Sequence, residues 1–224
     1  MTAGAQLPFD FAYRPAMGQE DFLIAPCNED AVAWVDAWPD WPASAVCIYG
    51  PPGCGKTHLA NVWRARSNAV FLAPEALTRA VPAELPGAAA ACVVDGAERA
   101  DERALLHLFN FQAERRGHLL LTAPLPPARW NIGLQDLRSR LLAAPSAEIG
   151  APDEGLIGAV MIKMFADRQI QVPHDVVIYL VMRIERSFDC VRRVVDLLDR
   201  AALSAHRSLT VPLAREVLRR HGLD

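Results

Sequence analysis

The sequence predicts an α/β fold in which a parallel sheet covered by helices is followed by a small all-helical region. Short apolar runs alternate with helix-like stretches over the first part of the chain, which is typical of a parallel sheet with both faces covered. After about Ile149 the strand pattern stops and only helical patterns remain. The expected strands are Ala45–Tyr49, Ala69–Leu72, Ala91–Val94 and His118–Thr122, and the expected helices of this region are Asn28–Trp38, Lys56–Arg66 and Glu102–Arg115.

Local signals support each element in turn. In the first helix apolar residues recur at three- and four-residue steps from Ala31 to Trp38, with Asn28 as the N-cap and Pro39 ending it. The run Ala45–Tyr49 is closed by a glycine, so it predicts a strand, a tight loop and then a helix. The later apolar runs are similarly short. The helices expected in the C-terminal region are Asp153–Asp167, Pro173–Arg183, Phe188–Ala205 and Pro212–Arg220.

The composition bounds the class of protein. The chain has 224 residues, of which 52% are hydrophobic and 22% charged, as in an ordinary globular protein with a small companion domain. Its net charge of −3 disfavours autonomous DNA binding. There is no membrane-spanning apolar run or signal peptide, so we expect a cytoplasmic protein without a membrane partner. The cysteines and histidines lack metal-ligand spacing, which indicates reduced thiols and no zinc site.

A phosphate-binding loop follows the first strand. Gly50–Thr57 reads GPPGCGKT, which fits the pattern G-x-x-x-x-G-K-[ST] between a strand and a helix. Such a loop turns successive backbone N–H groups toward phosphates, and the positive end of the helix points at them. Lys56 is expected to neutralise the β and γ phosphates, and Thr57 to hold Mg²⁺. The candidate nucleotide-binding residues are Gly50, Pro51, Pro52, Gly53, Cys54, Gly55, Lys56 and Thr57.

A second Mg²⁺ ligand is expected at the end of a neighbouring strand. Asp95 closes the apolar run Cys92-Val93-Val94 and is the candidate. The next position, where many ATPases carry an acidic residue that polarises the attacking water, is Gly96. Glu98 is two residues further round the turn, so we expect it to point elsewhere. The sequence therefore predicts a site that holds nucleotide but hydrolyses it weakly or not at all.

Three segments outside the general motif carry a family resemblance. Gly55–Leu59 reads GKTHL, Asp136–Leu141 reads DLRSRL and Leu209–Leu213 reads LTVPL. With them, nearly the whole chain resembles the Hda-like proteins of the DnaA clade of AAA+ ATPases. The resemblance implies an AAA+ P-loop base with a small α-helical lid, binding ADP or ATP with Mg²⁺. It adds His58 to the nucleotide site, and Leu23 and Ile24 as a base-contacting segment, although this apolar pair could equally belong to the core.

The resemblance also implies a partner-binding tail. Gln6–Phe11 reads QLPFDF and resembles the peptide by which Hda-like proteins grip the sliding clamp, although Asp10 departs from a proline of that pattern. Gln6, Leu7, Phe9 and Phe11 are the candidate clamp contacts. The alternative is that Phe9 and Phe11 fold back on the core. We expect residues 1–17 to form a flexible tail, residues 18–148 the nucleotide-binding base and residues 149–224 the lid.

Two further roles are implied by the resemblance. Arg140 in DLRSRL occupies the place of the arginine finger, which stabilises charge on a neighbour's γ-phosphate; the alternative is that it caps its helix or pairs with Asp136. Thr122 falls where the clade keeps a polar sensor. The lid arginine of the clade falls on Asp189, and Arg192 or Arg193 could replace it.

The implied function is negative regulation of replication initiation. The protein would dock on the sliding clamp, meet DNA only through it, and insert Arg140 beside the ATP held by DnaA. The alternatives are a self-sufficient AAA+ ATPase, such as a helicase loader or a DnaA-like initiation factor, and a DNA-binding initiator fragment. The sequence leaves open whether ADP or ATP is bound and whether the protein forms homo-oligomers.

Overall fold

Two compact units make up the computed structural model of the chain, which describes residues 22–77, 91–205 and 208–223. The boundary between the two units falls between Gly150 and Ala151. We call the described residues from Phe22 to Gly150 the sheet unit and those from Ala151 onward the helical unit. The proposed tail residues Gln6, Leu7, Phe9 and Phe11 lie outside the described residues.

The described part of the sheet unit contains a five-stranded parallel sheet with the strand order β2-β3-β4-β1-β5. Its strands are β1 (Ala45–Tyr49), β2 (Val70–Leu72), β3 (Ala91–Asp95), β4 (His118–Ala123) and β5 (Ser146–Glu148). Because all strands run in one direction, their carboxyl ends form a single edge of the sheet. Strand β4 lies between β1 and β3, so the loops that follow these three strands are neighbours at that edge.

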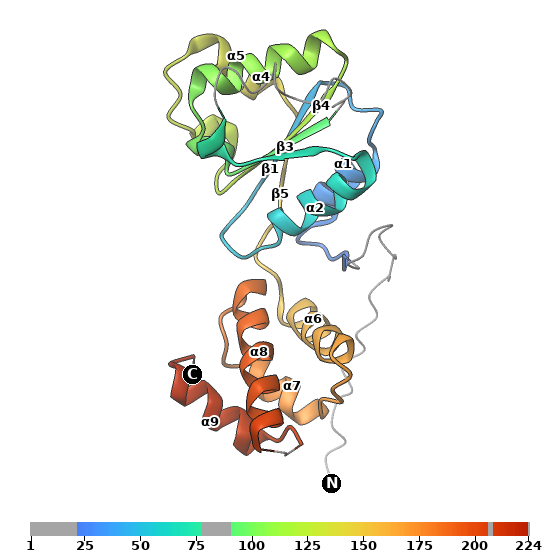
Figure 1. Ribbon diagram of the computed structural model, residues 1–224, viewed down its shortest axis with the longest axis vertical. Coiled ribbons are helices and arrows are strands. Elements are labelled where there is room, and N and C mark those ends of the chain that lie inside the picture. The colour runs from blue at the N-terminus through green and yellow to red at the C-terminus, as the bar shows by residue number, and fades with distance from the viewer. Residues whose placement is uncertain (1–21, 78–90, 206–207, 224) are drawn as a thin grey trace. The chain divides into compact units, whose positions relative to one another are not determined.

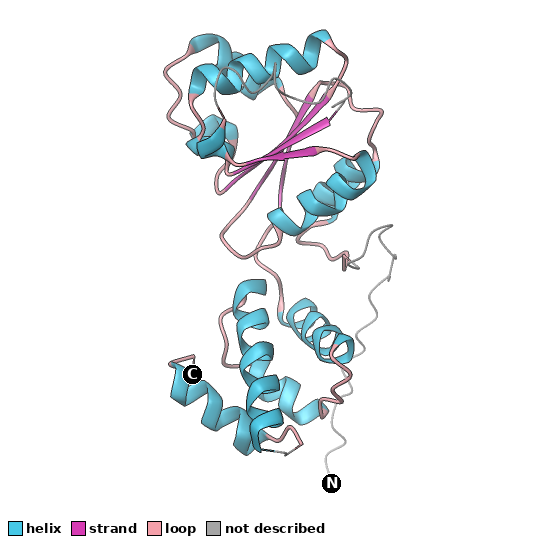
Figure 2. Ribbon diagram, in the orientation of Figure 1, coloured by secondary structure: helices cyan, strands magenta, loops and turns pink. Residues whose placement is uncertain are grey.

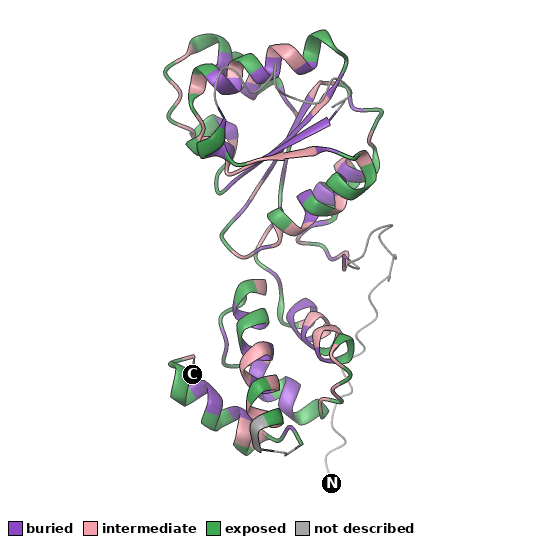
Figure 3. Ribbon diagram, viewed as in Figure 1, coloured by how far each residue is buried: buried purple, intermediate pink, exposed green. Residues whose placement is uncertain are grey.

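Helices cover both faces of this sheet. The pair α1 (Glu29–Asp36) and α2 (Lys56–Ser67) lies on one face, and the pair α4 (Glu102–Glu114) and α5 (Gln135–Ala143) lies on the other (Figure 1). Two hydrophobic clusters fill the interfaces, one including Trp63 of α2 and one including Leu105 of α4. The central strands β1, β3 and β4 are largely buried (Figure 3). Single 3-10 turns occur at η1 (Pro74–Ala76), η2 (Ala97–Arg99) and η3 (Pro127–Arg129).

Two details of the sheet unit differ from the prediction. Strand β5 was not expected, because Ala147 is its one buried residue and Ser146 and Glu148 are exposed, so it has no apolar run. Asn28 immediately precedes α1, but its side chain makes no cap bond to that helix. The Asn28 amide instead accepts from the Ala25 N–H at 2.9 Å and donates to the Leu23 carbonyl at 3.0 Å, so it fixes the entering chain.

The described residues of the helical unit form helices joined by loops, without a strand (Figure 2). The unit contains α6 (Glu154–Asp167), α7 (His174–Val181), α8 (Phe188–Ala205) and α9 (Val211–His221) around its own apolar core. Asp153 caps α6 by accepting from the Leu156 N–H at 2.7 Å. Each of these helices overlaps the span predicted for it, because the apolar residues that carry the periodicity are also those that pack in the core.

None of the helices that the structure describes is both long enough and apolar enough to cross a membrane.

Candidate functional site

The loop Gly50–Thr57 connects the end of β1 to the start of α2, and its path requires glycine at two positions. A Cβ atom on Gly50 would lie 2.0 Å from the Ile149 carbonyl oxygen, far inside van der Waals contact. Gly55, directly before α2, has a φ of 105°, which disfavours residues with a side chain. The backbone is therefore packed closely against the segment after β5, where the Ile149 N–H also donates to the Tyr49 carbonyl at 2.7 Å.

Lys56 supplies positive charge at the start of α2. Its ammonium group donates to the carbonyl oxygens of Gly50 at 2.7 Å and Pro51 at 2.9 Å, so it lies over the loop. The unpaired N–H groups at the start of α2 add partial positive charge at the same place. Phosphate oxygens would be stronger acceptors for this ammonium than the two carbonyls, because they are charged. The arrangement is suited to holding a phosphate chain.

Asp95 joins two hydroxyl groups at the carboxyl edge of the sheet. Its carboxylate accepts from the Thr57 hydroxyl at 2.9 Å and from the Thr122 hydroxyl. Asp95 and Thr122 are paired residues in the register of β3 and β4, which explains their contact. Mg²⁺ prefers oxygen ligands and usually takes one or two carboxylates from the protein. Thr57 and Asp95 are therefore placed to hold Mg²⁺ beside the phosphates, with Thr122 as a neighbour.

The turn after Asp95 carries no acid at its first position. Gly96 has a φ of 80°, and its N–H donates to the Thr122 hydroxyl oxygen at 3.0 Å. Glu98 lies in η2, where its Oε2 atom is buried and has no hydrogen-bond partner among the described residues. Burial, and to a smaller extent the charge of Glu98, raises the pKa of Cys47 to about 12. Cys47 belongs to the core cluster on the α4 face, whereas the carboxylate of Asp95 bonds to Thr57 at the start of α2.

Arg140 lies on α5, near its C-terminal end. Its Nε atom donates to the Asp136 carboxylate at 3.2 Å, and the two side chains are 38% and 60% exposed. This is the i,i+4 pair that the sequence left open as an alternative to the finger role. Exposed pairs of this type contribute only about 0.3–0.5 kcal/mol. A phosphate could therefore replace Asp136 at little cost.

The segment before α1 contacts the loop helix through a residue that the sequence analysis missed. Phe22 is buried and stacks on the His58 ring, with centroids 5.3 Å apart. Leu23 and Ile24 are only half-buried, and Ile24 packs against the core cluster that includes Trp63. Ile24 thus packs in the core, which is the alternative that the sequence left open. The sequence shows that Phe22 stands beside the apolar pair Leu23 and Ile24, but it does not show that Phe22 contacts His58.

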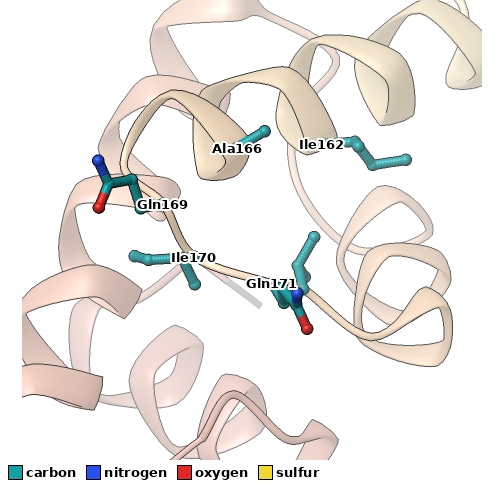
Figure 4. A pocket seen from close by; sticks show the side chains of 6 residues that line it. Ile162, Ala166, Gln169, Ile170 and Gln171 are labelled. Atoms are coloured by element: carbon teal, nitrogen blue, oxygen red, sulfur yellow. The ribbon is translucent and has the colours of Figure 1, made fainter.

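The lid arginine expected from the family resemblance falls on Asp189, which lies at the start of α8 in the helical unit. Asp189 accepts from Arg192 at 3.3 Å in an exposed i,i+3 pair. A hollow of about 580 Å³ also occurs in this unit, between the second half of α6 and the segment that follows it (Figure 4). It contains none of the predicted site residues and no charged side chain. It is lined by Ile162, Ala166, Gln169, Ile170, Gln171 and Val172.

Comparisons with known proteins identify the fold. Residues 158–218 match the family model described as Hda, lid domain. The chain is similar to domain III of the replication initiation protein DnaA from Thermotoga maritima, with a TM-score of 0.76 and 16% identity over 89% of this chain and 94% of that one. It is also similar to AMPPCP-bound DnaA from Aquifex aeolicus (TM-score 0.69, 16% identity, 84% and 66% coverage). A third match is the Holliday junction branch migration motor RuvB from Thermotoga maritima (TM-score 0.71, 14% identity, 86% and 67% coverage). The predicted fold, a parallel α/β base with a helical lid, is confirmed.

Proposed function

We propose that this Hda-like AAA+ protein of the DnaA clade binds an adenine nucleotide and stimulates hydrolysis of the ATP held by DnaA, thereby limiting replication initiation. The observation that carries the proposal is the Thr57–Asp95–Thr122 contact beside Lys56, in a chain whose helical unit matches the Hda lid. The contact forms a site suited to Mg²⁺ and phosphate, and the lid match relates the chain to replication proteins.

The chain's own nucleotide has a structural role in this proposal. Lys56 and the loop amides bind the phosphates, while Thr57 and Asp95 hold Mg²⁺, which neutralises phosphate charge when bound. Gly96 provides no group to orient an attacking water. Hydrolysis at this site is therefore weak, and ADP is the favoured resident nucleotide. His58 and the segment from Phe22 to Ile24 lie at the same loop helix and are the candidates for contact with the base.

Arg140 acts on the partner's nucleotide. The guanidinium group is always charged and planar, so it can neutralise charge that spreads over the phosphoryl oxygens during hydrolysis. Its Nε atom is held by Asp136. This contact leaves the two terminal nitrogens as donors for a γ-phosphate oxygen. An arginine finger raises the hydrolysis rate by roughly 10³ to 10⁵ where it has been dissected.

Clamp docking is the second part of the proposal and rests on the sequence of the tail. Gln6, Leu7, Phe9 and Phe11 offer one amide and three large apolar groups, which suits insertion of an extended peptide into apolar pockets. DNA is reached only through the clamp, as the acidic net charge indicates. Deletion of residues 1–12 is expected to abolish clamp capture and leave nucleotide binding intact.

A self-sufficient ATPase is the second candidate, because the Thr57, Asp95 and Thr122 constellation is complete. It predicts steady phosphate release by the purified chain alone, at a rate comparable to AAA+ motors. Our proposal predicts little release without DnaA. A phosphate-release assay on the isolated protein separates the two functions.

The direct test of the main proposal is the hydrolysis of DnaA-bound ATP in the presence of DNA-loaded clamp. Arg140→Ala is expected to lower the stimulated rate by roughly 10³ while clamp binding is unchanged. Arg138→Ala is the matched control, because Arg138 lies on the same helix and is exposed. Equal stimulation by the wild-type chain and Arg140→Ala would reject the finger assignment.

A further inference from the structure

The start of α5, the helix that carries Arg140, is held by a side chain from another helix. Glu102, at the beginning of α4, accepts two backbone hydrogen bonds. Its Oε1 atom accepts from the Gly133 N–H at 3.0 Å, and its Oε2 atom accepts from the Leu134 N–H at 2.7 Å. Both donors directly precede Gln135, where α5 begins. One carboxylate therefore fixes the last two residues before the helix.

This contact resembles one half of a capping box, in which a glutamate accepts from the N–H of the N-cap residue. Leu134 is the N-cap residue of α5, and its side chain cannot accept a hydrogen bond. Hydrogen bonds to a charged acceptor are roughly twice as strong as neutral ones, and two of them on one planar group also define an orientation. The carboxylate that fixes the N-cap residue of α5 thus comes from α4, more than thirty residues earlier in the chain.

The remaining contacts of α5 with α4 and the sheet are apolar and less directional. Leu137 and Leu141 of α5 pack in the cluster that contains Leu105 and Leu108 of α4. Apolar packing is less directional than a hydrogen bond, because its free energy is roughly proportional to the buried area. The two hydrogen bonds to Glu102 therefore add a directional contact at the start of α5, the helix that carries Arg140.

A short segment of the chain connects Glu102 to Asp95, one of the residues proposed to hold Mg²⁺. This segment contains the single turn η2, and Asp101 caps α4 by accepting from the Ala104 N–H at 2.9 Å. The Gly96 N–H, at the beginning of this connection, is bonded to Thr122. The start of α5 is thereby tied to the carboxyl edge of the sheet on which the chain's own nucleotide site is built.

We propose that Glu102 is a positioning residue for the arginine finger: its carboxylate fixes the start of α5 and so sets where Arg140 is presented to the partner's triphosphate. This inference rests on the proposed function. Reaction rates are sensitive to placement, since a displacement of about 1 Å can cost about 10²-fold. A finger on a helix without this anchor would reach the γ-phosphate less often in the reactive geometry.

Glu102→Gln tests the inference, because the amide keeps the size of the side chain but can accept through only one oxygen. Glu114→Gln is the matched control, since Glu114 is exposed at the other end of α4. In the full-length protein, Glu102→Gln is expected to accelerate hydrogen exchange at the Gly133 and Leu134 amides by about tenfold. Thermal melting verifies that both variants are folded, and Glu102→Asp, which keeps the charge on a shorter side chain, is expected to be intermediate.

The functional readout is the maximal stimulated rate of DnaA ATP hydrolysis. Glu102→Gln is expected to lower this rate about tenfold, with clamp binding and the half-saturating DnaA concentration unchanged. In an Arg140→Ala background it should cause no further loss, which a general structural defect would cause. Faster exchange with an unchanged rate, or a further loss without Arg140, overturns the positioning role.

The two proposals fail in different ways. If the wild-type chain gives no stimulation at all, the proposed function is rejected, and with it the role of Glu102 in positioning the Arg140 finger. The exchange measurement needs no DnaA, so it still reports whether Glu102 anchors α5. Unchanged exchange in Glu102→Gln rejects the anchor even where stimulation by the wild type is strong.

Discussion

Asp95 and Thr122 face each other across β3 and β4, and the Thr122 hydroxyl donates to the Asp95 carboxylate while accepting from the Gly96 N–H. Thr122 is fully buried, whereas Asp95 is half-buried and also bonds to the exposed Thr57. One hydroxyl therefore fixes both the carboxylate proposed to bind Mg²⁺ and the turn that follows it.

Replacement of Thr122 by valine should destabilise the sheet unit. Valine can neither accept from the Gly96 N–H nor donate to Asp95, so the free energy of unfolding should fall by about 1–3 kcal/mol. Thr57→Val removes a hydroxyl from an exposed position and should cost less than about 1 kcal/mol while weakening Mg²⁺-dependent nucleotide binding. Urea unfolding of the two variants measures the difference, and equal losses would contradict the role of Thr122.

Gly50 should not tolerate a side chain. An added Cβ would lie 2.0 Å from the Ile149 carbonyl oxygen, so Gly50→Ala must displace the loop or the segment after β5. We expect a loss of about 2–3 kcal/mol of stability together with loss of nucleotide binding. Gly150→Ala is the matched control, because its Cβ would meet Cys27 at an ordinary 3.5 Å. A stable, nucleotide-binding Gly50→Ala protein would refute this account of the loop.

His118 should make stability fall in mild acid. Burial lowers its pKa, partly offset by a hydrogen bond with the Pro39 backbone, and its ring lies edge-on to Trp41 at 5.5 Å. The unfolded chain takes up this proton near pH 6.5 and the folded chain only at lower pH. The contribution of His118 is therefore present above about pH 6.5 and lost as the pH falls below it. The urea midpoint of His118→Gln should change less between about pH 7.5 and 5.5 than that of the wild type, and an equal change in both proteins would contradict this role of His118.

The cysteines should differ in reactivity. Burial raises the pKa of Cys47 to about 12 and that of Cys92 to about 11, and it also raises the pKa values of Cys54 and Cys190. Cys27 is the half-buried one of the five. Because the thiolate is the reactive form, alkylation near pH 8 should modify Cys27 first. Peptide mapping by mass spectrometry checks the order, and rapid labelling of Cys47 in the folded protein would contradict it.

The sequence could predict the parts of the fold that depend on local patterns. The run Ala45–Tyr49 was found with the bounds seen in the structure, since it is apolar throughout and closed by Gly50. The helix Phe188–Ala205 was found in the same way from its amphipathic period. Strand β5 was missed because an edge strand with one buried residue has no distinct pattern.

In the candidate site, too, the residues that follow local sequence patterns could be predicted, whereas the contacts between distant residues could not. The candidate phosphate loop and Asp95 could be proposed from the sequence because each directly follows an apolar run. The contact of Thr122 with Asp95 depends on the order β3-β4-β1, which the runs alone do not fix. The stacking of Phe22 on His58 and the anchoring of α5 by Glu102 join residues far apart in the chain, so only the folded structure brings them together.

Calorimetric titration of Mg-ADP into the nucleotide-free protein tests most directly whether the loop holds a nucleotide. The account predicts saturable binding at one site, tighter than about 1 mM, and loss of this binding in Lys56→Ala. Lys163→Ala is the matched control, because Lys163 is the chain's other lysine and pairs with Asp167 on α6. Absence of binding by the wild type at millimolar ADP or ATP, or equal binding by Lys56→Ala, would contradict it.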